Sequence, residues 1–238
     1  MAKRLANKKA IVTGATRGIG RAIAKALRAD GAYVVGTGTG NAQPAGYDEH
    51  FAADFGDLEQ IRRCAEFVRA CAPDILINNA GINKIGPFAE IAPEDFRRIQ
   101  QVNVFAPFSL CQAAIPGMKR NGWGRIVNVS SIWGKISREH RASYSASKFA
   151  LDGLTIALAA EHSADGILAN CVAPGFIDTE LTRQVLGEEG ARKVAGSVPV
   201  RRLGTAEEIA RLVAWLSSPE NTYVTGQNIA VDGGFTRV

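Results

Sequence analysis

Long apolar runs, paired cysteines and clustered basic residues are all missing from this sequence. No window holds eighteen consecutive apolar residues, and a membrane-spanning helix needs about that many. The apolar stretch that follows the first basic residues, positions 10–13, is too short for a secretory signal peptide. We therefore expect no association with a membrane.

The four cysteines, at positions 64, 71, 111 and 171, are far apart and form no C-x-x-C pair. Each lies among apolar neighbours, which is typical of buried free thiols in a reducing compartment. The sequence therefore favours a cytoplasmic protein without disulfides, and we expect no metal site.

The net charge of +5 and the pI of about 9.2 raise the question of nucleic-acid binding. Lysine and arginine are scattered, however, and the one cluster free of acids is Lys3-Arg4…Lys8-Lys9 near the amino terminus. A modest positive field is better suited to attracting anionic cofactors or substrates. We expect no nucleic-acid partner.

The sequence does contain a regular alternation of strands and helices. Its 238 residues, 46% of them apolar, suffice for one domain with a full core. Apolar runs predict strands that end near positions 13, 36, 53, 78, 130, 172 and 231. Helices are predicted over 18–27, 57–70, 93–120 (with a disturbance near Pro107 and Pro116), 144–162 and 205–216. We infer a single-domain, Rossmann-type α/β fold, a doubly wound parallel sheet of about seven strands with helices on both faces.

A glycine-rich turn, Thr13-Gly-Ala-Thr-Arg-Gly-Ile-Gly20, joins the first predicted strand to the first predicted helix. Glycines in such a turn let the backbone approach a pyrophosphate, which then faces the N-terminus of the helix. A generic glycine turn is the alternative, but the position in the first βα unit favours a dinucleotide-binding loop. The spacing is G-x-x-x-G-x-G rather than the common G-x-G-x-x-G.

Tyr144 and Lys148 are four residues apart at the start of a predicted helix, so their side chains share one helix face. A fixed cation beside a phenol lowers the pKa of the phenol. A phenol tuned in this way can exchange a proton with a substrate oxygen. Taken alone, such a pair more often belongs to a partly exposed helix surface.

Together these motifs resemble the short-chain dehydrogenase/reductase family along nearly the whole chain. The resemblance rests on Thr13–Gly20, Asn78-Asn-Ala-Gly81, Asn103, Ser131, Tyr144-x-x-x-Lys148, Pro174-Gly175 and the tail Thr225-Gly-Gln…Val231-Asp-Gly-Gly234. Within the family, the chain is most similar to the bacterial 3-oxoacyl-[acyl-carrier-protein] reductases. The resemblance implies an NAD(P)-dependent enzyme that interconverts a carbonyl and a secondary alcohol.

The resemblance implies four catalytic residues: Asn103, Ser131, Tyr144 and Lys148. Ser131 and Tyr144, thirteen positions apart, would hydrogen-bond the substrate oxygen. Lys148 would bind the nicotinamide ribose and lower the pKa of Tyr144, and Asn103 would continue a proton relay to solvent through a water. A protein that binds the dinucleotide without turning it over is the alternative, but the presence of the whole set favours an enzyme.

The resemblance also implies a cofactor site. Its expected contacts are Gly14, Thr16, Arg17, Gly18, Ile19, Gly20, Thr37, Asp54, Asn78, Ala80, Gly81, Tyr144, Lys148, Pro174, Gly175, Ile177 and Thr179. Asp54 would accept from the adenine amine, although it could equally cap the next helix. NAD-preferring members carry an acid after the second strand, where this chain has no acid before Asp48. Because Arg17 could pair with a 2′-phosphate, we expect NADP(H) to be preferred over NAD(H).

The resemblance implies a 3-oxoacyl thioester as substrate, with a place in fatty acid biosynthesis. Reductases that act on the carrier protein grip it with two arginines, and this chain has Gly122 and Asp165 at those places. Acyl carrier protein is therefore a doubtful partner, and a sugar or polyol dehydrogenase of a carbohydrate pathway is the alternative.

The loop over 133–141 is basic, with Lys135, Arg138 and Arg141 beside the expected site. If these side chains point inward they suit an anionic substrate. If they point outward, which we slightly favour, they form a solvated face or a subunit contact. The segment around 176–200 suits a substrate lid, and the family resemblance implies a homotetramer.

Overall fold

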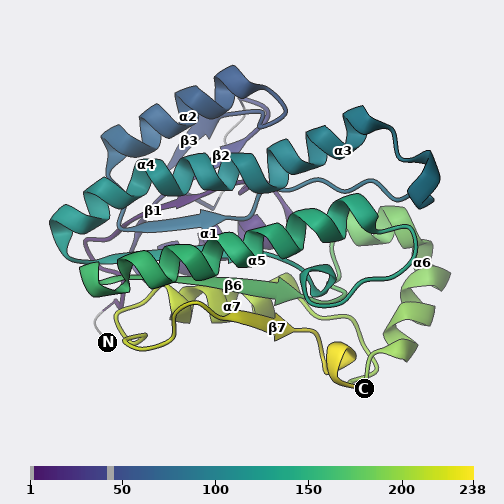
Figure 1. Cartoon of the computed structure of the whole chain (residues 1–238). Coiled ribbons are helices and arrows are strands. Elements are labelled where there is room, and N and C mark those ends of the chain that lie inside the picture. Colours follow the sequence, from purple (N-terminus) through teal and green to yellow (C-terminus); the bar gives the residue numbers. More distant parts are fainter. Residues whose placement is uncertain (1–2, 42–45) are drawn as a thin grey trace.

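The computed structural model describes residues 3–41 and 46–238. Within these ranges, seven strands form one parallel sheet in the order β3-β2-β1-β4-β5-β6-β7 (Figure 1). The strands are β1 (Lys9–Val12), β2 (Tyr33–Gly38), β3 (Glu49–Ala52), β4 (Ile75–Asn78), β5 (Gly124–Val129), β6 (Ile167–Pro174) and β7 (Asn228–Val231). The predicted fold, a doubly wound parallel sheet in one domain, is confirmed.

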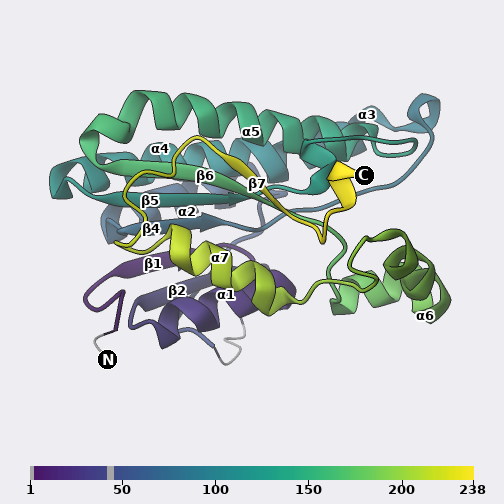
Figure 2. The same ribbon diagram turned by 90° about the horizontal axis from the view of Figure 1, so that it is seen from below.

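Helices cover the two faces of the sheet as separate layers (Figure 2). On one face lie α1 (Gly18–Ala29) and α7 (Ala206–Leu216), which pack on each other, and on the other lie α2 (Leu58–Cys71), α4 (Ala106–Asn121) and α5 (Ala142–His162). The remaining helices, α3 (Pro93–Gln100) and α6 (Glu180–Ser197), extend past the end of the sheet toward which the β6 arrow points. In the described part of the chain, no helix has the length and apolar character needed to cross a bilayer.

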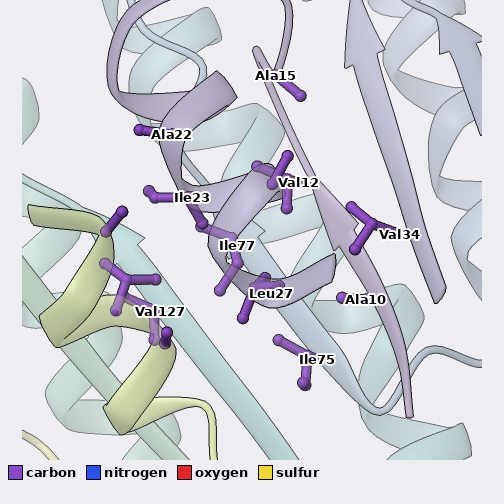
Figure 3. Close-up of a cluster of buried hydrophobic side chains, with 14 of the residues drawn as sticks. Ala10, Val12, Ala15, Ala22, Ile23, Leu27, Val34, Ile75, Ile77 and Val127 are labelled. Atoms are coloured by element: carbon purple, nitrogen blue, oxygen red, sulfur yellow. The ribbon is translucent and has the colours of Figure 1, made fainter. Parts of the chain in front are cut away.

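The core is divided between the two faces of the sheet because successive side chains of a strand point in opposite directions. In β1, Val12 faces α1 and α7, whereas Ile11 faces α2 and α4. The side of α1 and α7 collects Ala10, Val12, Ile23, Leu27, Val34, Ile75, Ile77 and Val127, most of them fully buried (Figure 3). Burial on both faces explains why the strands read as continuous apolar runs.

The helix predicted over 93–120 is interrupted, but at neither proline. A π-helical turn, Gln101–Phe105, separates α3 from α4. Pro107 lies in the first turn of α4, where no backbone donor is needed, and Pro116 is tolerated inside it. The turn contains Asn103, whose fully buried amide bonds to a neighbouring segment instead of solvent. Such turns are frequent at functional sites.

The segment predicted to be a substrate lid contains α6, with a break at Gly187 (φ 64°, ψ −179°). Its two ends are joined at the base: Gly204 N–H donates to the Phe176 carbonyl at 2.9 Å, and Asp178 N–H donates to the Gly204 carbonyl at 2.8 Å. Helix α6 was not predicted because its sequence is polar and contains glycine. We call the stretch between these joined ends, residues 178–203, the α6 excursion.

Two predicted helix starts are confirmed. The Asp57 carboxylate accepts from the N–H groups of Glu59 and Gln60 ahead of α2. Thr205 and Glu208 form a complete capping box at the start of α7. Such caps satisfy backbone donors that have no partner within the helix.

Candidate active site

The predicted site residues gather at the carboxyl edge of the sheet. The glycine loop follows β1, residues 79–82 follow β4, Ser131 follows β5 and residues 175–179 follow β6. The chain runs from β1 outward through β2 and β3, and then returns to place β4 on the other side of β1. Open α/β sheets bind ligands at such a reversal of strand order.

The glycine loop is held by its neighbours on both sides. Ala15 N–H donates to the Thr37 carbonyl at 2.9 Å, which joins the loop to β2. On the other side, Asn79 Nδ2 donates to the carbonyl oxygens of Thr13 (2.9 Å) and Gly14 (3.2 Å). Asn79 was not among the predicted site residues, although adjacent residues at a strand end point to opposite faces and only one of two asparagines can face this loop.

Asn78 points the other way. Its side chain is buried, and Nδ2 donates to Asn128 Oδ1 at 2.8 Å and to Cys111 Sγ at 3.3 Å. The side chain of Asn78 therefore faces Asn128 and Cys111, and its contact with the cofactor stays a prediction. Asp54 uses one carboxylate oxygen to accept from Gly56 N–H at 2.8 Å. The alternative role as cap of the next helix belongs to Asp57 instead, and adenine binding by Asp54 stays a prediction.

The N-terminus of α1 fits an anionic group. The helix has no side-chain cap and no acid in its first turn, and the preceding Arg17 is extended and exposed. Gly14 and Gly18 have φ values of +64° and +53°, a region that side chains disfavour. A cradle of free helix N–H groups and close backbone suits a pyrophosphate, so the loop fits the dinucleotide expected from the sequence.

The segment after β6 reaches across to the same loop. Gly175 N–H donates to the Val231 carbonyl at 3.0 Å, and a Cβ at Gly175 would lie 2.7 Å from the Asp232 backbone. Further along, Ile177 is buried and Thr179 Cγ2 would lie 3.8 Å from a Cβ placed on Gly18. The ends of β1 and β6 thus border one region.

The remaining predicted cofactor contacts belong to the same loops. Thr37 is buried under the glycine loop, and its hydroxyl accepts from Gly14 N–H at 3.4 Å. Thr16 lies in the glycine loop and Ile19 in the first turn of α1. Ala80 and the exposed Gly81 follow β4, and the buried Pro174 ends β6.

Replacing Gly20 by alanine should displace the glycine loop. A Cβ at this position would lie 2.2 Å from the Gly14 carbonyl oxygen and 2.4 Å from Asn79 Nδ2. The Gly14 backbone and the hydrogen-bonded Asn79 amide can move away only by breaking contacts of the loop. We therefore expect a loss of about 1–3 kcal/mol in the free energy of unfolding and at least tenfold weaker NADPH binding. Thermal unfolding and a fluorescence titration with NADPH measure the two effects.

The control is Gly196→Ala, because a Cβ at Gly196 would meet nothing within 4 Å. Native NADPH affinity in Gly20→Ala would show that the loop does not hold the cofactor.

Ser131, Tyr144 and Lys148 meet beside this loop. Lys148 is buried, and its Nζ donates to the Val129 carbonyl at 2.9 Å and lies 5.6 Å from the centre of the Tyr144 ring. The Tyr144 phenol is half-buried and interacts with the Ser131 hydroxyl. The predicted grouping of these three side chains is what the structure shows, while their catalytic roles stay a prediction.

The pKa of Tyr144 is shifted in the direction opposite to the one expected from the sequence. Burial raises the pKa of Tyr144, while the hydrogen bond with Ser131 and the charge of Arg141 act to lower it. Burial lowers the pKa of Lys148 to about 8. Lys148 Nζ donates to the Val129 carbonyl, and its predicted effect on the pKa of Tyr144 stays a prediction. Within the protein alone, desolvation outweighs the nearby charges.

Asn103 fastens the segment after β4 to α5. Its Nδ2 donates to the Ile82 carbonyl at 2.9 Å and to Ser147 Oγ at 3.0 Å, and its Oδ1 accepts from Ile82 N–H at 2.9 Å. A Cβ at Gly81 would lie 3.3 Å from Asn103 Oδ1 and 3.6 Å from Lys148 Nζ. The Asn103 amide therefore positions the segment at Gly81 and Ile82 next to Lys148. The proton relay through a water stays a prediction.

The basic loop does not have a single orientation. Lys135 Nζ donates to the Asn228 carbonyl at 2.8 Å, and Arg138 is exposed beside Glu139. Arg141, by contrast, is half-buried, with its guanidinium carbon 5.5 Å from the centre of the buried Trp133 ring. The outward orientation that we favoured slightly holds for Arg138 and not for Arg141.

Cations near the expected carrier-protein surface are committed to other contacts. Lys119 pairs with Asp165 at 2.9 Å. Arg125 is buried and donates to the backbone carbonyls of Gly166 and Asn221 at 3.1 and 2.9 Å. Neither side chain replaces the arginines whose places are taken by Gly122 and Asp165.

Comparisons with known proteins agree with this geometry. A family described as Enoyl-(Acyl carrier protein) reductase matches residues 14–236. The 3-oxoacyl-[acyl-carrier-protein] reductase FabG of Escherichia coli K12 is 38% identical over 240 residues, which cover 97% of this chain and 98% of that protein.

Two solved structures extend the comparison to sugar chemistry. The gluconate 5-dehydrogenase of Burkholderia cenocepacia, in complex with NADP and tartrate, superposes with a TM-score of 0.91 at 31% identity, covering 100% of this chain and 98% of that one. The aldohexose dehydrogenase of Thermoplasma acidophilum gives a TM-score of 0.92 at 31% identity, covering 99% and 96%. With a family match over nearly all of the chain and full-length relatives that are dehydrogenases and reductases, the chain is an oxidoreductase that belongs to the short-chain dehydrogenase/reductase family.

Proposed function

We propose that this protein interconverts a carbonyl and a secondary alcohol with NADP(H), using Tyr144 to give or take the proton. The observation that carries the proposal is the meeting of Ser131, Tyr144 and Lys148 beside the glycine loop. When bound, the nicotinamide would supply or accept the hydride. Ser131 and Tyr144 would hold the substrate oxygen, and Lys148 would hold the ribose.

The glycine loop, Arg17 and Thr179 would hold the cofactor phosphates, with Asn79 keeping the loop in shape. Asn103 would keep Ile82 and Ser147 in place around Lys148, and the α6 excursion would act as the substrate lid. The four free cysteines, three of them buried, support a cytoplasmic location.

Cofactor preference should depend on Arg17. The chain carries no acid between Thr37 and Asp48 to bind a 2′-hydroxyl, and Arg17 is exposed next to the glycine loop. We expect native kcat/KM to favour NADPH, and Arg17→Gln to reduce that preference roughly tenfold, since a charge-assisted hydrogen bond is lost. Steady-state kinetics with both cofactors measure this, with Arg21→Gln, at an exposed position of α1, as the control. A tenfold native preference for NADH would contradict the proposal.

The first candidate substrate is a 3-oxoacyl thioester, which the similarity to the Escherichia coli reductase supports. A sugar or polyol substrate is the second candidate. It is supported by the absence of arginines at Gly122 and Asp165, and by the neighbouring gluconate and aldohexose dehydrogenases. A panel of 3-oxoacyl thioesters, simple ketones and keto sugars, followed by NADPH oxidation, distinguishes the candidates. The absence of turnover with every class, in both directions, would reject the proposed function.

A homotetramer is the assembly that we propose, with α4 and α5 at one interface. These helices and the π-turn before them expose large apolar side chains, Phe105, Phe108, Phe149 and Ile156. Exposed apolar patches of this kind mark association surfaces. Light scattering should report four copies of the 25.3-kDa chain.

A further inference from the structure

An aromatic wall stands beside the catalytic groups. Trp133, two residues after Ser131, is buried and packs edge-to-face against Phe176 and Phe235, with ring centres 6.2 and 6.5 Å away. Phe176 and Phe235 pack on each other at 5.1 Å. The wall therefore joins the loop after β5, the loop after β6 and the turn at residues 235–237 into one surface.

Two arginines lie over the Trp133 ring. The guanidinium carbon of Arg141 is 5.5 Å and that of Arg138 is 5.9 Å from the ring centre. Both distances are within the range of a cation–π contact. Arg138 is exposed and its acidic partner is the adjacent Glu139, at 3.5 Å. Within residues 3–41 and 46–238, Arg141 has no carboxylate in ion-pair range and its side chain donates no hydrogen bond.

This arrangement is electrostatically unfavourable as it stands. Partial burial and the nearby charge of Arg138 both lower the pKa of Arg141. Half-buried guanidinium groups usually find an acidic partner, because an unpaired buried charge is costly. An anion placed against Arg141 would offset both the burial and the repulsion between the two arginines.

The charge of Arg141 is close to the reacting position. Arg141 directly precedes α5, three residues before Tyr144, and the two groups influence each other electrostatically. The start of α5 has no side-chain cap and no acid in its first turn, so its dipole also favours an anion. A negative charge held here would therefore lie near the Tyr144 phenol.

We propose that Arg141, assisted by Arg138, binds a carboxylate that the substrate carries near its reacting carbon. A guanidinium presents two parallel N–H donors that match the two oxygens of a carboxylate. The substrate class would then be keto acids and hydroxy acids, polyhydroxy acids included, rather than neutral 3-oxoacyl thioesters. This inference rests on the proposed function, since it takes Tyr144 as the group that meets the carbonyl.

The test compares acetoacetate with its ethyl ester, which present the same 3-oxo group with and without a carboxylate. We expect native kcat/KM to be higher for the acid. In Arg141→Gln, the acid-to-ester ratio of kcat/KM should fall roughly tenfold to a hundredfold, mainly through KM, because a charge-assisted contact is lost. Arg141→Lys should recover part of the ratio. The control is Arg69→Gln, which removes the same charge from an exposed site on α2.

Binding is measured separately by titrating the full chain with malonate and following tryptophan fluorescence. We expect a saturable change that is absent in Arg141→Gln and in Trp133→Phe. If Arg141→Gln leaves the acid-to-ester ratio unchanged while the ester is reduced, the inference is overturned and the proposed function stands. If neither compound is reduced, the proposed function is weakened, and a malonate response that is the same in native protein and Arg141→Gln would overturn the inference independently.

Discussion

Tyr144→Phe should lower kcat by about 10²–10⁴-fold, the contribution of a positioned general acid or base. The change removes one oxygen atom and leaves the ring, which Lys148 Nζ approaches to 5.6 Å, in its packing. Because the hydroxyl acts on a proton that moves only during the reaction, kcat should fall far more than KM changes. Steady-state kinetics give both constants, and a fluorescence titration should show unchanged NADPH affinity.

Tyr223→Phe is the matched control, because Tyr223 is 94% exposed and lies outside the site. Turnover near the native level in Tyr144→Phe would reject Tyr144 as the acid–base group. Lost NADPH binding in the same variant would instead indicate a structural defect, which Tm would reveal.

Lys148→Met should stop turnover and yet stabilise the fold. Burial lowers the pKa of Lys148 from 10.5 to about 8, so the folded protein holds the proton less tightly than the unfolded chain does. At neutral pH the ammonium is charged in both states, and its burial costs the native state roughly 3 kcal/mol. Methionine removes that cost but leaves the Val129 carbonyl without its 2.9-Å donor. We expect a net gain of about 1–2 kcal/mol in the free energy of unfolding.

The difference in stability between the native protein and Lys148→Met should depend on pH. Between pH 8 and 10.5 the unfolded chain binds more protons at this site, so the stability of the native protein should rise with pH in that window relative to Lys148→Met. Urea unfolding at pH 7 and pH 10 measures this change: the variant should be the more stable protein at pH 7, and the native protein should have overtaken it by pH 10, since the shift is worth about 2.5 kcal/mol over that range. Lys25→Met, at an exposed position of α1, serves as the control. A variant less stable than the native protein at pH 7 would show that the Val129 hydrogen bond outweighs desolvation.

Local hydrogen bonding made much of the fold predictable. The starts of α2 and α7, predicted at positions 57 and 205, are fixed by neighbouring residues, the Asp57 cap and the Thr205–Glu208 capping box, and both starts occur as predicted. Parallel strands buried on both faces are equally visible as apolar runs. The meeting of Ser131, Tyr144 and Lys148 was expected from the resemblance to the short-chain dehydrogenase/reductase family.

Features that depend on distant contacts were not predictable in the same way. The π-turn at Asn103 arises because its amide bonds to Ile82 and Ser147, which are 21 and 44 positions away. Whether Asn78 or Asn79 faces the glycine loop depends on the register of β4 beside β1. The raised pKa of Tyr144 reflects burial by the surrounding structure, which the Tyr-x-x-x-Lys spacing does not contain.

The two ends of the α6 excursion are held together by backbone hydrogen bonds, so the residues between them could be exchanged as a unit. The Ile177–Gly204 bridge and its hydrogen bonds already bring the two ends together. The contact of the excursion with the segment after β7 is made by its last residues, where Val200 N–H donates to the Gly233 carbonyl at 3.4 Å. The entropic cost of a longer or shorter connection changes only with the logarithm of its length. Residues 178–203 could therefore be exchanged with the corresponding stretch of a relative, transferring substrate preference while β6, β7 and the glycine loop keep their places.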